Sequence, residues 1–373
     1  MSTLRSLAQT EWPFHADTFG LTGRLISIFP HGSGHINDSF AVTLERAGTP
    51  VRYLLQRINH RIFQNVPALM DNISRVTAHL RRRLAAEPDA ARRSLRLVPT
   101  VPGEPCARDA KGDWWRCYEF IERATSHDLI QHPHQAREAA RAFGEFQRLL
   151  DDLPGARLNE TIPCFHNTRQ RFDRLRAVIA ADPAGRVHEA AAEIAFARER
   201  EGMVDRLLTL CAHGDIPERI THNDTKISNV LFDAATGAGL CVVDLDTVMP
   251  GLALYDFGDM VRTAANAATE DETDLARVEV RLPLFEALAE GYLSTAGGFL
   301  NPVERRELAF AGRLITYEQG LRFLTDYLAG DIYYKIHRPA HNLERTRNQW
   351  AFLRRLEHHA GAMEAIVARH TIR

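Results

Sequence analysis

The chain has 373 residues, of which 45% are hydrophobic and 25% are charged, a composition that excludes wholesale disorder, collagen and coiled coil. Its 46 basic and 48 acidic residues give a formal net charge of −2, so no overall basic field recruits nucleic acid or an anionic membrane. The sequence has no apolar run of the roughly 18 residues that a membrane helix needs, and no secretory signal core. The five cysteines are scattered and form no CxxC motif. We therefore expect a cytoplasmic protein with reduced thiols and no nucleic-acid or membrane partner, as a monomer or a homodimer.

The first 120 residues are predicted to be mainly β structure around one long helix. Apolar runs at 25–29, 40–44 and 52–58 are separated by turn residues and predict three strands. Residues 66–86 carry apolar side chains every three or four positions, which predicts an amphipathic helix. Further strands are expected within 95–121, with a turn near 109–113.

After Glu122 the pattern becomes helical. Ala-rich or amphipathic segments predict helices at 134–151, 187–212, 275–296, 303–329 and 342–369. One β segment at 219–246 interrupts them and is predicted to form a hairpin around the turn 235–239. The expected fold class is therefore α+β with two lobes, 1–121 and 122–373, the outline of a two-lobed kinase. Because a fold outline does not establish chemistry, function has to be argued from residues.

The strongest motif is the segment 221–229, which reads THNDTKISN and precedes an apolar strand. It has the spacing of the kinase catalytic loop, His-x-Asp, then four residues, then Asn. In that role Asp224 orients the attacking hydroxyl and accepts its proton, while Asn229 reaches a magnesium ion. Both groups must converge on one γ-phosphate, which requires a rigid loop.

A second acidic motif follows the next strand, where 241–246 reads CVVDLD. Asp244 leaves the hairpin as the expected ligand of Mg²⁺, a cation that prefers oxygen ligands. Strand alternation predicts that Asp246 points to the same side, as a second ligand or as a group that faces the substrate. The structural alternative is a pair of polar loops that merely flank a hairpin. The coupling of both motifs to the two apolar strands favours function.

The chain resembles the aminoglycoside phosphotransferase/choline kinase superfamily, and within it the branch that contains bacterial N-acetylhexosamine 1-kinase. The resemblance spans roughly residues 20–355. The segments that carry it are 35–40 (HINDSF), 55–59 (LQRIN), 72–76 (NISRV), 221–226 (THNDTK), 244–251 (DLDTVMPG) and 321–328 (LRFLTDYL). It implies a kinase that uses ATP and Mg²⁺ to phosphorylate the anomeric hydroxyl of an N-acetylhexosamine, GlcNAc or GalNAc.

The loop 31–37 joins the first two predicted strands, where kinases place a glycine-rich cover for the phosphates. Gly32, Gly34 and His35 are the candidate ATP-binding residues, because glycines let the backbone approach phosphate closely. The loop does not match GxGxxG, and on pattern alone a plain hairpin turn fits equally well.

Arg57 occupies the strand position where kinases place the lysine that grips the α- and β-phosphates, and Asp71 would be its helix partner. Arginine can clamp phosphate through its forked donors, but the shorter aspartate makes the ion pair doubtful. The alternative is an arginine on an exposed strand face. The resemblance also places the backbone of Glu119 and Ile121 against adenine.

The acceptor site is expected on the helical lobe, facing Asp224. Arg322 and Asp326 are four residues apart and share a helix face. The resemblance points to Arg322 and Tyr333 as substrate-contacting residues, with donors for sugar oxygens and an aromatic ring. An intrahelical Arg322–Asp326 pair with a core tyrosine is the structural alternative. Residues 165–169 are weaker candidates.

Two other functions compete with a hexosamine kinase. One is a kinase for another hydroxylated metabolite, such as an aminoglycoside, choline, homoserine or another sugar. Arg322 argues against a cationic acceptor. The other is a nucleotide-binding module without catalysis, which the intact Asp224, Asn229 and Asp244 disfavour. The resemblance assigns the segment 255–259 a structural role in buttressing the catalytic loop, so Asp256 is expected to be structural.

Overall fold

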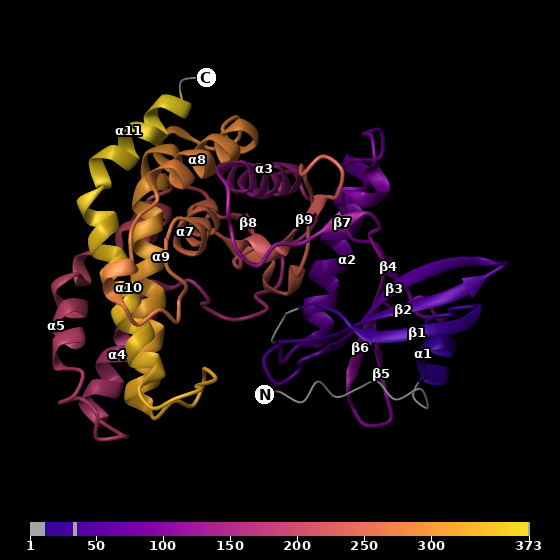
Figure 1. The fold of residues 1–373 in the computed structure, drawn as a ribbon, viewed down its shortest axis with the longest axis horizontal. Helices are drawn as coiled ribbons and strands as arrows, with labels where there is room; N and C mark the ends of the chain where they lie inside the picture. The colour runs from indigo at the N-terminus through magenta and orange to yellow at the C-terminus, as the bar shows by residue number, and fades with distance from the viewer. Residues whose placement is uncertain (1–11, 33–35, 372–373) are drawn as a thin grey trace.

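The computed structural model describes residues 12–32 and 36–371, and these residues form a sheet lobe and a helical lobe (Figure 1). The sheet lobe holds an antiparallel sheet of strand order β1-β2-β3-β6-β4, with β5 also paired to β6. Its strands are β1 (Arg24–Pro30), β2 (Asp38–Arg46), β3 (Thr49–Ile58), β4 (Leu97–Val98), β5 (Ala107–Arg108) and β6 (Trp114–Glu119).

The two faces of this sheet pack against different partners because side chains alternate along each strand. Phe40, Val42 and Leu55 point to one face, where a small core includes Trp12 and Phe19 from the α1 region (α1, Trp12–Thr18). On the opposite face Ile58 and Tyr118 join the main core of the molecule. The second face therefore looks towards the helical lobe.

Helix α2 (Val66–Arg83) lies against this second face and contributes Ile73, Val76 and other buried residues to the main core. Asn65 caps its first turn, accepting a hydrogen bond from the Ala68 backbone at 3.1 Å. The helix ends three residues before the predicted residue 86. The Glu87-Pro88 step follows, and a residue before proline avoids the helical conformation.

The chain leaves the sheet lobe after β6, and the next strand already belongs to the other lobe. β7 (Ala124–Thr125) pairs with β9 (Val230–Asp233), which in turn pairs with β10 (Gly239–Val242). A separate two-stranded ladder joins β8 (Arg219–Thr221) to β11 (Met249–Gly251). The crossing thus falls in residues 120–123, next to the boundary predicted at 121.

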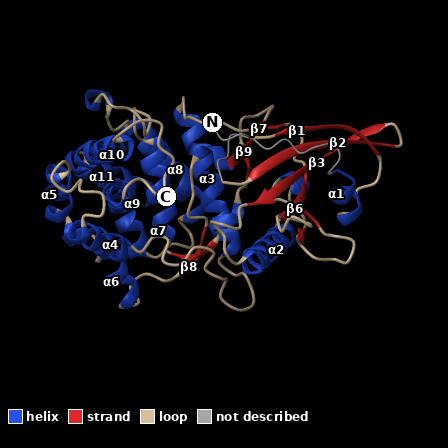
Figure 2. Ribbon diagram, turned by 90° about the horizontal axis from the view of Figure 1, so that it is seen from below, coloured by secondary structure: helices blue, strands red, loops and turns tan. Residues whose placement is uncertain are grey.

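The helical lobe is built around the long helix α9, as Figure 2 shows from below. Its helices are α3 (Pro133–Leu150), α4 (Thr168–Ala181), α5 (Ala191–Glu199), α6 (Arg206–Ala212), α7 (Ala253–Ala264), α8 (Leu282–Ala296), α9 (Pro302–Ala329), α10 (His341–His358) and α11 (Ala360–Thr371). Asn301 and Glu304 form a capping box at the start of α9, and Gly330 ends it at φ +97°. α7 packs so closely on α9 that a Cβ at Gly258 would meet the Ala311 carbonyl oxygen at 2.5 Å.

The predicted α+β, two-lobed fold is confirmed, and the differences are local. The segment 187–212 divides into α5 and α6, and 342–369 is broken at His359 into α10 and α11. Sequence reasoning predicted neither α4 nor α7. Among the described residues, no helix is long and apolar enough to cross a membrane.

Candidate active site

The segment 222–229 connects β8 to β9 and is held between the two small ladders of the helical lobe. Met249 on β11 pairs with Thr221 at the end of β8, and Val242 on β10 pairs with Val230 at the start of β9. The Val243 backbone also donates to the Asn229 carbonyl at 2.9 Å. These contacts fix both ends of the loop and place Asn229 next to the strand exit that leads to Asp244.

Two buried carboxylates of α7 anchor the backbone of this loop. Asp256 accepts hydrogen bonds from the backbone N–H groups of His222 at 2.8 Å and Asn223 at 2.7 Å. Asp259 accepts one from the Thr225 backbone at 2.9 Å. The predicted structural role of Asp256 as a buttress is confirmed, and its complete burial raises the pKa of its carboxyl group.

Asp224 presents its carboxylate from the middle of the anchored loop. Its Oδ2 accepts a hydrogen bond from Asn229 Nδ2 at 2.9 Å and lies 2.9 Å from the Lys226 ammonium. Burial works to raise the pKa of Asp224, but the Lys226 charge and the Asn229 amide outweigh it and lower that pKa below its usual value. Asp224 is therefore ionised at neutral pH, and no described residue occupies its Oδ1.

Lys226 was not predicted as a site residue, although it lies inside the motif. Its ammonium also interacts electrostatically with Asp244. The sequence signal for Lys226 was a basic residue two positions after Asp224, the aspartate of the motif.

Asp244 lies just beyond β10 with a left-handed backbone, φ +61° and ψ +57°, which turns its carboxylate out of the strand direction. Burial and the neighbouring carboxylates of Asp246 and Asp224 raise the pKa of Asp244 to about 6. Within the described residues its carboxylate accepts no hydrogen bond. A half-buried carboxylate with like-charged neighbours is relieved by a bound cation.

The side-chain oxygen atoms of Asn229 and Asp244 are suitable ligands for a magnesium ion. The Asn229 amide nitrogen is bound to Asp224, which leaves its amide oxygen to face outward, and the Asp244 carboxylate is unpartnered by the described residues. Two protein oxygens leave the remaining positions of an octahedral cation to phosphate and water, the usual arrangement for Mg²⁺.

The carboxylates of Asp246 and Asp244 are neighbours, but strand alternation is not the reason. Residues Leu245–Thr247 form a 3₁₀ turn after the left-handed Asp244, so strand alternation does not apply. Asp246 is buried and forms an ion pair with Arg116 on β6, and it also accepts a hydrogen bond from Asn37. Both of its oxygens are bound within the protein, so a direct contact with substrate is not available in this structure.

Arg57 also lies elsewhere than expected. It follows Leu55 on the sheet face that looks away from the helical lobe, and it pairs with Asp38 at 2.5 Å and Asp113 at 3.5 Å. Asp71 lies 3.6 Å from Arg75 instead, so the kinase-type ion pair is not formed. The prediction that Arg57 binds phosphate is therefore wrong. Arg57 lies on the face of β3 that points away from the helical lobe.

Arg116 is a buried residue that sequence reasoning did not identify as part of the site. It is 1% exposed and faces Asp246 across the lobes, and its Nε donates to Gln56 at 3.0 Å. The signal was an arginine in the middle of an otherwise apolar strand.

The other predicted nucleotide contacts are only partly described. Gly32 has a left-handed backbone, φ +81°, and open space where a Cβ would be. Gly34 and His35 lie outside the described residues. Glu119 ends β6 and its side chain pairs with Arg96 at 3.1 Å, and the half-buried Ile121 packs on the main core. Contact of their backbone with adenine stays a prediction.

The predicted acceptor residues cluster at the end of α9. The Arg322 guanidinium lies over the rings of Phe165 and Tyr334, at 5.2 and 5.8 Å from their centroids. Asp326 does not pair with Arg322 but accepts the backbone N–H groups of Ile332, Tyr333 and Tyr334 at 2.8–3.0 Å. The side chain of Tyr333 is left 61% exposed.

The weaker candidates have structural roles, apart from Phe165. His166 and Thr168 both bind Glu318, at 2.8 and 2.6 Å. Asn167 caps α4, and Arg169 forms surface ion pairs with Asp205 and Glu201. The charge of Arg262 on α7 interacts with those of both Asp224 and Arg322.

Comparison with known proteins fits this arrangement of lobes and loops. A family model described as the phosphotransferase enzyme family matches residues 27–298. In fold, the chain is similar to an aminoglycoside phosphotransferase from Alicyclobacillus acidocaldarius, with 12% identity, a TM-score of 0.56, and coverage of 91% of this chain and 93% of that one. It is also similar to a choline kinase from Cryptosporidium parvum, with 14% identity, a TM-score of 0.52, and coverage of 93% and 92%.

The chain is thus a two-lobed phosphotransferase by fold. Because the family model spans most of its length, it belongs to the phosphotransferase enzyme family. The low identities to the solved structures support the fold alone, and they leave the acceptor to be argued from the site.

Proposed function

We propose that this protein is an ATP- and Mg²⁺-dependent kinase that transfers the γ-phosphate to the anomeric hydroxyl of an N-acetylhexosamine. The observation that supports the proposal is the grouping of Asp224 with Asn229, which hydrogen-bond at 2.9 Å on a loop anchored by α7, and with Asp244, whose charge interacts with that of Asp224. Nothing in the proposal depends on Arg57 or on a direct substrate contact of Asp246.

Asp224 is the catalytic residue in this mechanism. Its ionised carboxylate, held by Lys226 and Asn229, leaves Oδ1 to accept a hydrogen bond from the acceptor hydroxyl. Phosphoryl transfer passes through a loose transition state, so alignment of the hydroxyl matters more than a strong base. The lowered pKa of Asp224 suits this role, because the group stays ionised at neutral pH.

Asn229 and Asp244 would hold the magnesium ion, which supplies charge neutralisation at the β- and γ-phosphates. The raised pKa of Asp244 supports the assignment, because the carboxylate has neighbours of its own sign and lacks a described partner. Lys226, between Asp224 and Asp244, adds a positive charge where the transferred phosphoryl group would pass.

The chemistry near Arg322 supports a neutral, oxygen-rich acceptor. The guanidinium is flanked by two aromatic rings, and among the described residues it hydrogen-bonds only to the neutral Gln319 amide, at 3.1 Å. A fixed cation with free donors fits sugar hydroxyls or an acetamide carbonyl, and it repels a cationic amino alcohol. The exposed ring of Tyr333 offers a surface for a sugar face.

The test is phosphate transfer from labelled ATP to a panel of GlcNAc, GalNAc, other free sugars, aminoglycosides, choline and homoserine. We expect transfer to the N-acetylhexosamines, with NMR of the product placing the phosphate on the anomeric carbon. Asp224→Asn should fold with an unchanged melting temperature and lower kcat by about 10²–10⁴-fold. Turnover near the wild-type rate would remove Asp224 from its role, and transfer only to cationic acceptors would replace the proposed substrate.

A further inference from the structure

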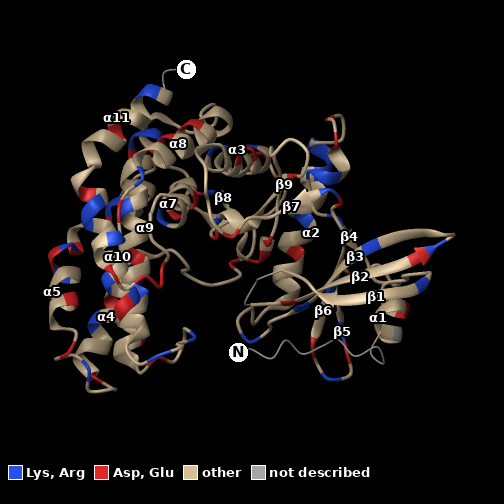
Figure 3. Cartoon of the chain, in the orientation of Figure 1, with Lys and Arg blue, Asp and Glu red and all other residues tan. Residues whose placement is uncertain are grey.

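A cavity of about 690 Å³ opens beside α2, outside the predicted catalytic centre. One wall is the outer side of α2 with Arg75, Ala78, Arg81, Arg82 and Ala85, and the other is the segment that leads to β4, with Ser94 and Arg96. Leu153 and Pro154, after α3, line it from the helical lobe, and Glu119 at the end of β6 adds one carboxylate to the lining. Figure 3 shows basic residues gathered at the end of α2 and in the segment that follows.

Four guanidinium groups line this cavity and are only partly neutralised. Arg96 pairs with Glu119 at 3.1 Å, and Arg75 lies 3.6 Å from Asp71. Arg81 has no carboxylate within ion-pair distance among the described residues, and Arg82 contacts only the His79 ring, at 3.4 Å. The cavity therefore carries an excess of positive charge that the described protein does not balance.

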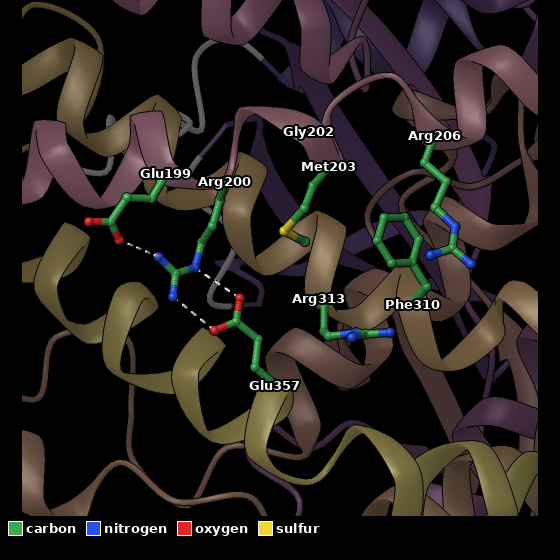
Figure 4. A pocket seen from close by; sticks show the side chains of 8 residues that line it. All are labelled: Glu199, Arg200, Gly202, Met203, Arg206, Phe310, Arg313 and Glu357. Atoms are coloured by element: carbon green, nitrogen blue, oxygen red, sulfur yellow. Dashed lines mark hydrogen bonds and ion pairs between the residues drawn. The ribbon is translucent and has the colours of Figure 1, made fainter.

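The other large cavity, between α5, α9 and α10, gives the matching contrast (Figure 4). There Arg200 is bound by Glu357 at 2.8 and 3.0 Å, and Glu199 adds a further contact at 3.3 Å. Arg206 pairs with Glu307 at 2.8 Å. Arginines in that cavity are paired within the protein, whereas Arg81 and Arg82 beside α2 have no carboxylate partner among the described residues.

Ser94 lies in the wall of the cavity but does not present a donor to it. The residue is 3% exposed, and its hydroxyl oxygen is shielded from solvent and has no hydrogen-bond partner in the described part of the chain. The charge and the volume of the cavity therefore carry the argument for a ligand.

The helix dipole does not explain this arrangement. Basic residues in the last turn of a helix are favourable, which accounts for Arg81 and Arg82. It does not account for Arg75 two turns earlier, nor for Arg96 on the opposite wall, nor for the open volume between the walls.

We propose that the cavity beside α2 binds a phosphate-bearing organic molecule, with Arg81, Arg82 and Arg96 around the phosphate. Arginine forks match phosphate oxygens through paired hydrogen bonds. The volume lies within the range of about 300–1,000 Å³ that small-molecule pockets occupy, larger than an inorganic phosphate needs. Ala78, Ala85 and Pro154 form the apolar surface for the carbon part of the ligand.

The test uses phenyl phosphate as the probe, titrated by calorimetry at low salt with EDTA present, with phenol and inorganic phosphate as the comparison arms. We expect saturable binding of phenyl phosphate to the wild type, at least fivefold weaker binding of inorganic phosphate, and none of phenol. Arg81→Gln and Arg96→Gln should each weaken phenyl phosphate binding at least fivefold.

Two further variants make the result specific. Arg83→Gln removes the same charge from the same helix turn but does not line the cavity, and it should leave the affinity within twofold. Ala78→Leu leaves the charge unchanged and narrows the apolar wall of the cavity, and it should weaken phenyl phosphate binding. The proposal is overturned if the wild type shows no saturable binding, if Arg83→Gln weakens binding as much as Arg81→Gln, or if Ala78→Leu binds normally.

Discussion

Two loops of the helical lobe are each anchored by a buried aspartate, but their side chains differ in exposure. In the segment 222–229, Asp256 on α7 accepts two backbone N–H groups, and His222 and Asn223 are buried. In the loop after α9, Asp326 accepts three backbone N–H groups, yet Ile332 and Tyr333 remain 76% and 61% exposed. A buried carboxylate can therefore fix the path of a loop while the surrounding packing decides whether its side chains are sealed or presented.

This difference corresponds to the two tasks of a phosphotransferase. The chemical groups must be held to within fractions of an ångström, whereas acceptor recognition needs side chains that reach into solvent. The same substitution in the two anchors tests that division of labour, because either aspartate already accepts hydrogen bonds on both oxygens.

Asp256→Asn should give the largest effect. One oxygen becomes an NH₂ group that faces an existing donor, so we expect about 3 kcal/mol or more of lost stability in chemical denaturation. The displaced loop should also lower kcat by about 10²-fold, because Asp224 is no longer aligned. A variant with wild-type stability and kcat would show that the loop does not depend on α7.

Asp326→Asn should affect binding more than chemistry. We expect a loss of about 1–3 kcal/mol in stability, since Tyr334 and Asn342 share one oxygen of Asp326 and Ile332 and Tyr333 share the other. Steady-state kinetics should show a raised KM for the acceptor with kcat within about threefold of the wild type. A fall in kcat as large as that of Asp256→Asn would erase the distinction between the two loops.

The pH dependence of stability probes the chemical side of the comparison. The pKa of Asp244 is raised to about 6 in the folded state, against about 3.9 in an unfolded chain, so the folded protein disfavours the ionised form. In metal-free buffer Asp244→Asn should be more stable than the wild type by about 1–3 kcal/mol at pH 7.5. The advantage should shrink as the pH falls from 6 towards 4, where protonation relieves the wild type. Urea denaturation of both proteins across this range checks the sign, and a gain that persists unchanged at pH 4 would contradict it.

Tyr333→Ala should give the smallest effect on the fold. The exposed ring contributes within about 0.5 kcal/mol to stability, so the melting temperature should not move measurably. We expect the KM of the acceptor to rise while the KM of ATP stays unchanged. An unchanged acceptor KM would leave Tyr333 without a role in the proposed site.

The sequence was sufficient for elements whose residues follow one periodicity. α2 and α9 repeat apolar residues at helical spacing, and the first three strands are bounded by clear turns. α7 was missed because its buried face includes Asp256 and Asp259, which break the apolar pattern while anchoring the catalytic loop. Polar residues in the core conceal an element from any argument based on hydropathy.

The corrected site residues share a different cause. The orientation of Asp246 was inferred from alternation, and the left-handed backbone at Asp244 ends the strand before alternation can act. Arg57 was chosen by position along β3. Which face of β3 meets the helical lobe depends on α1 and α2, whose packing lies far away in sequence. Arg116, on the facing side of β6, could be found only once the strands were paired.

The buried pair between Arg116 and Asp246 also restricts how the enzyme moves. Arg116 belongs to the sheet and Asp246 to the helical lobe, so separating the lobes at this point would break a buried, hydrogen-bonded ion pair. Any opening of the two lobes is therefore expected to turn about this pair. Their outer edges would move apart while the contact between β6 and the turn after β10 stays closed.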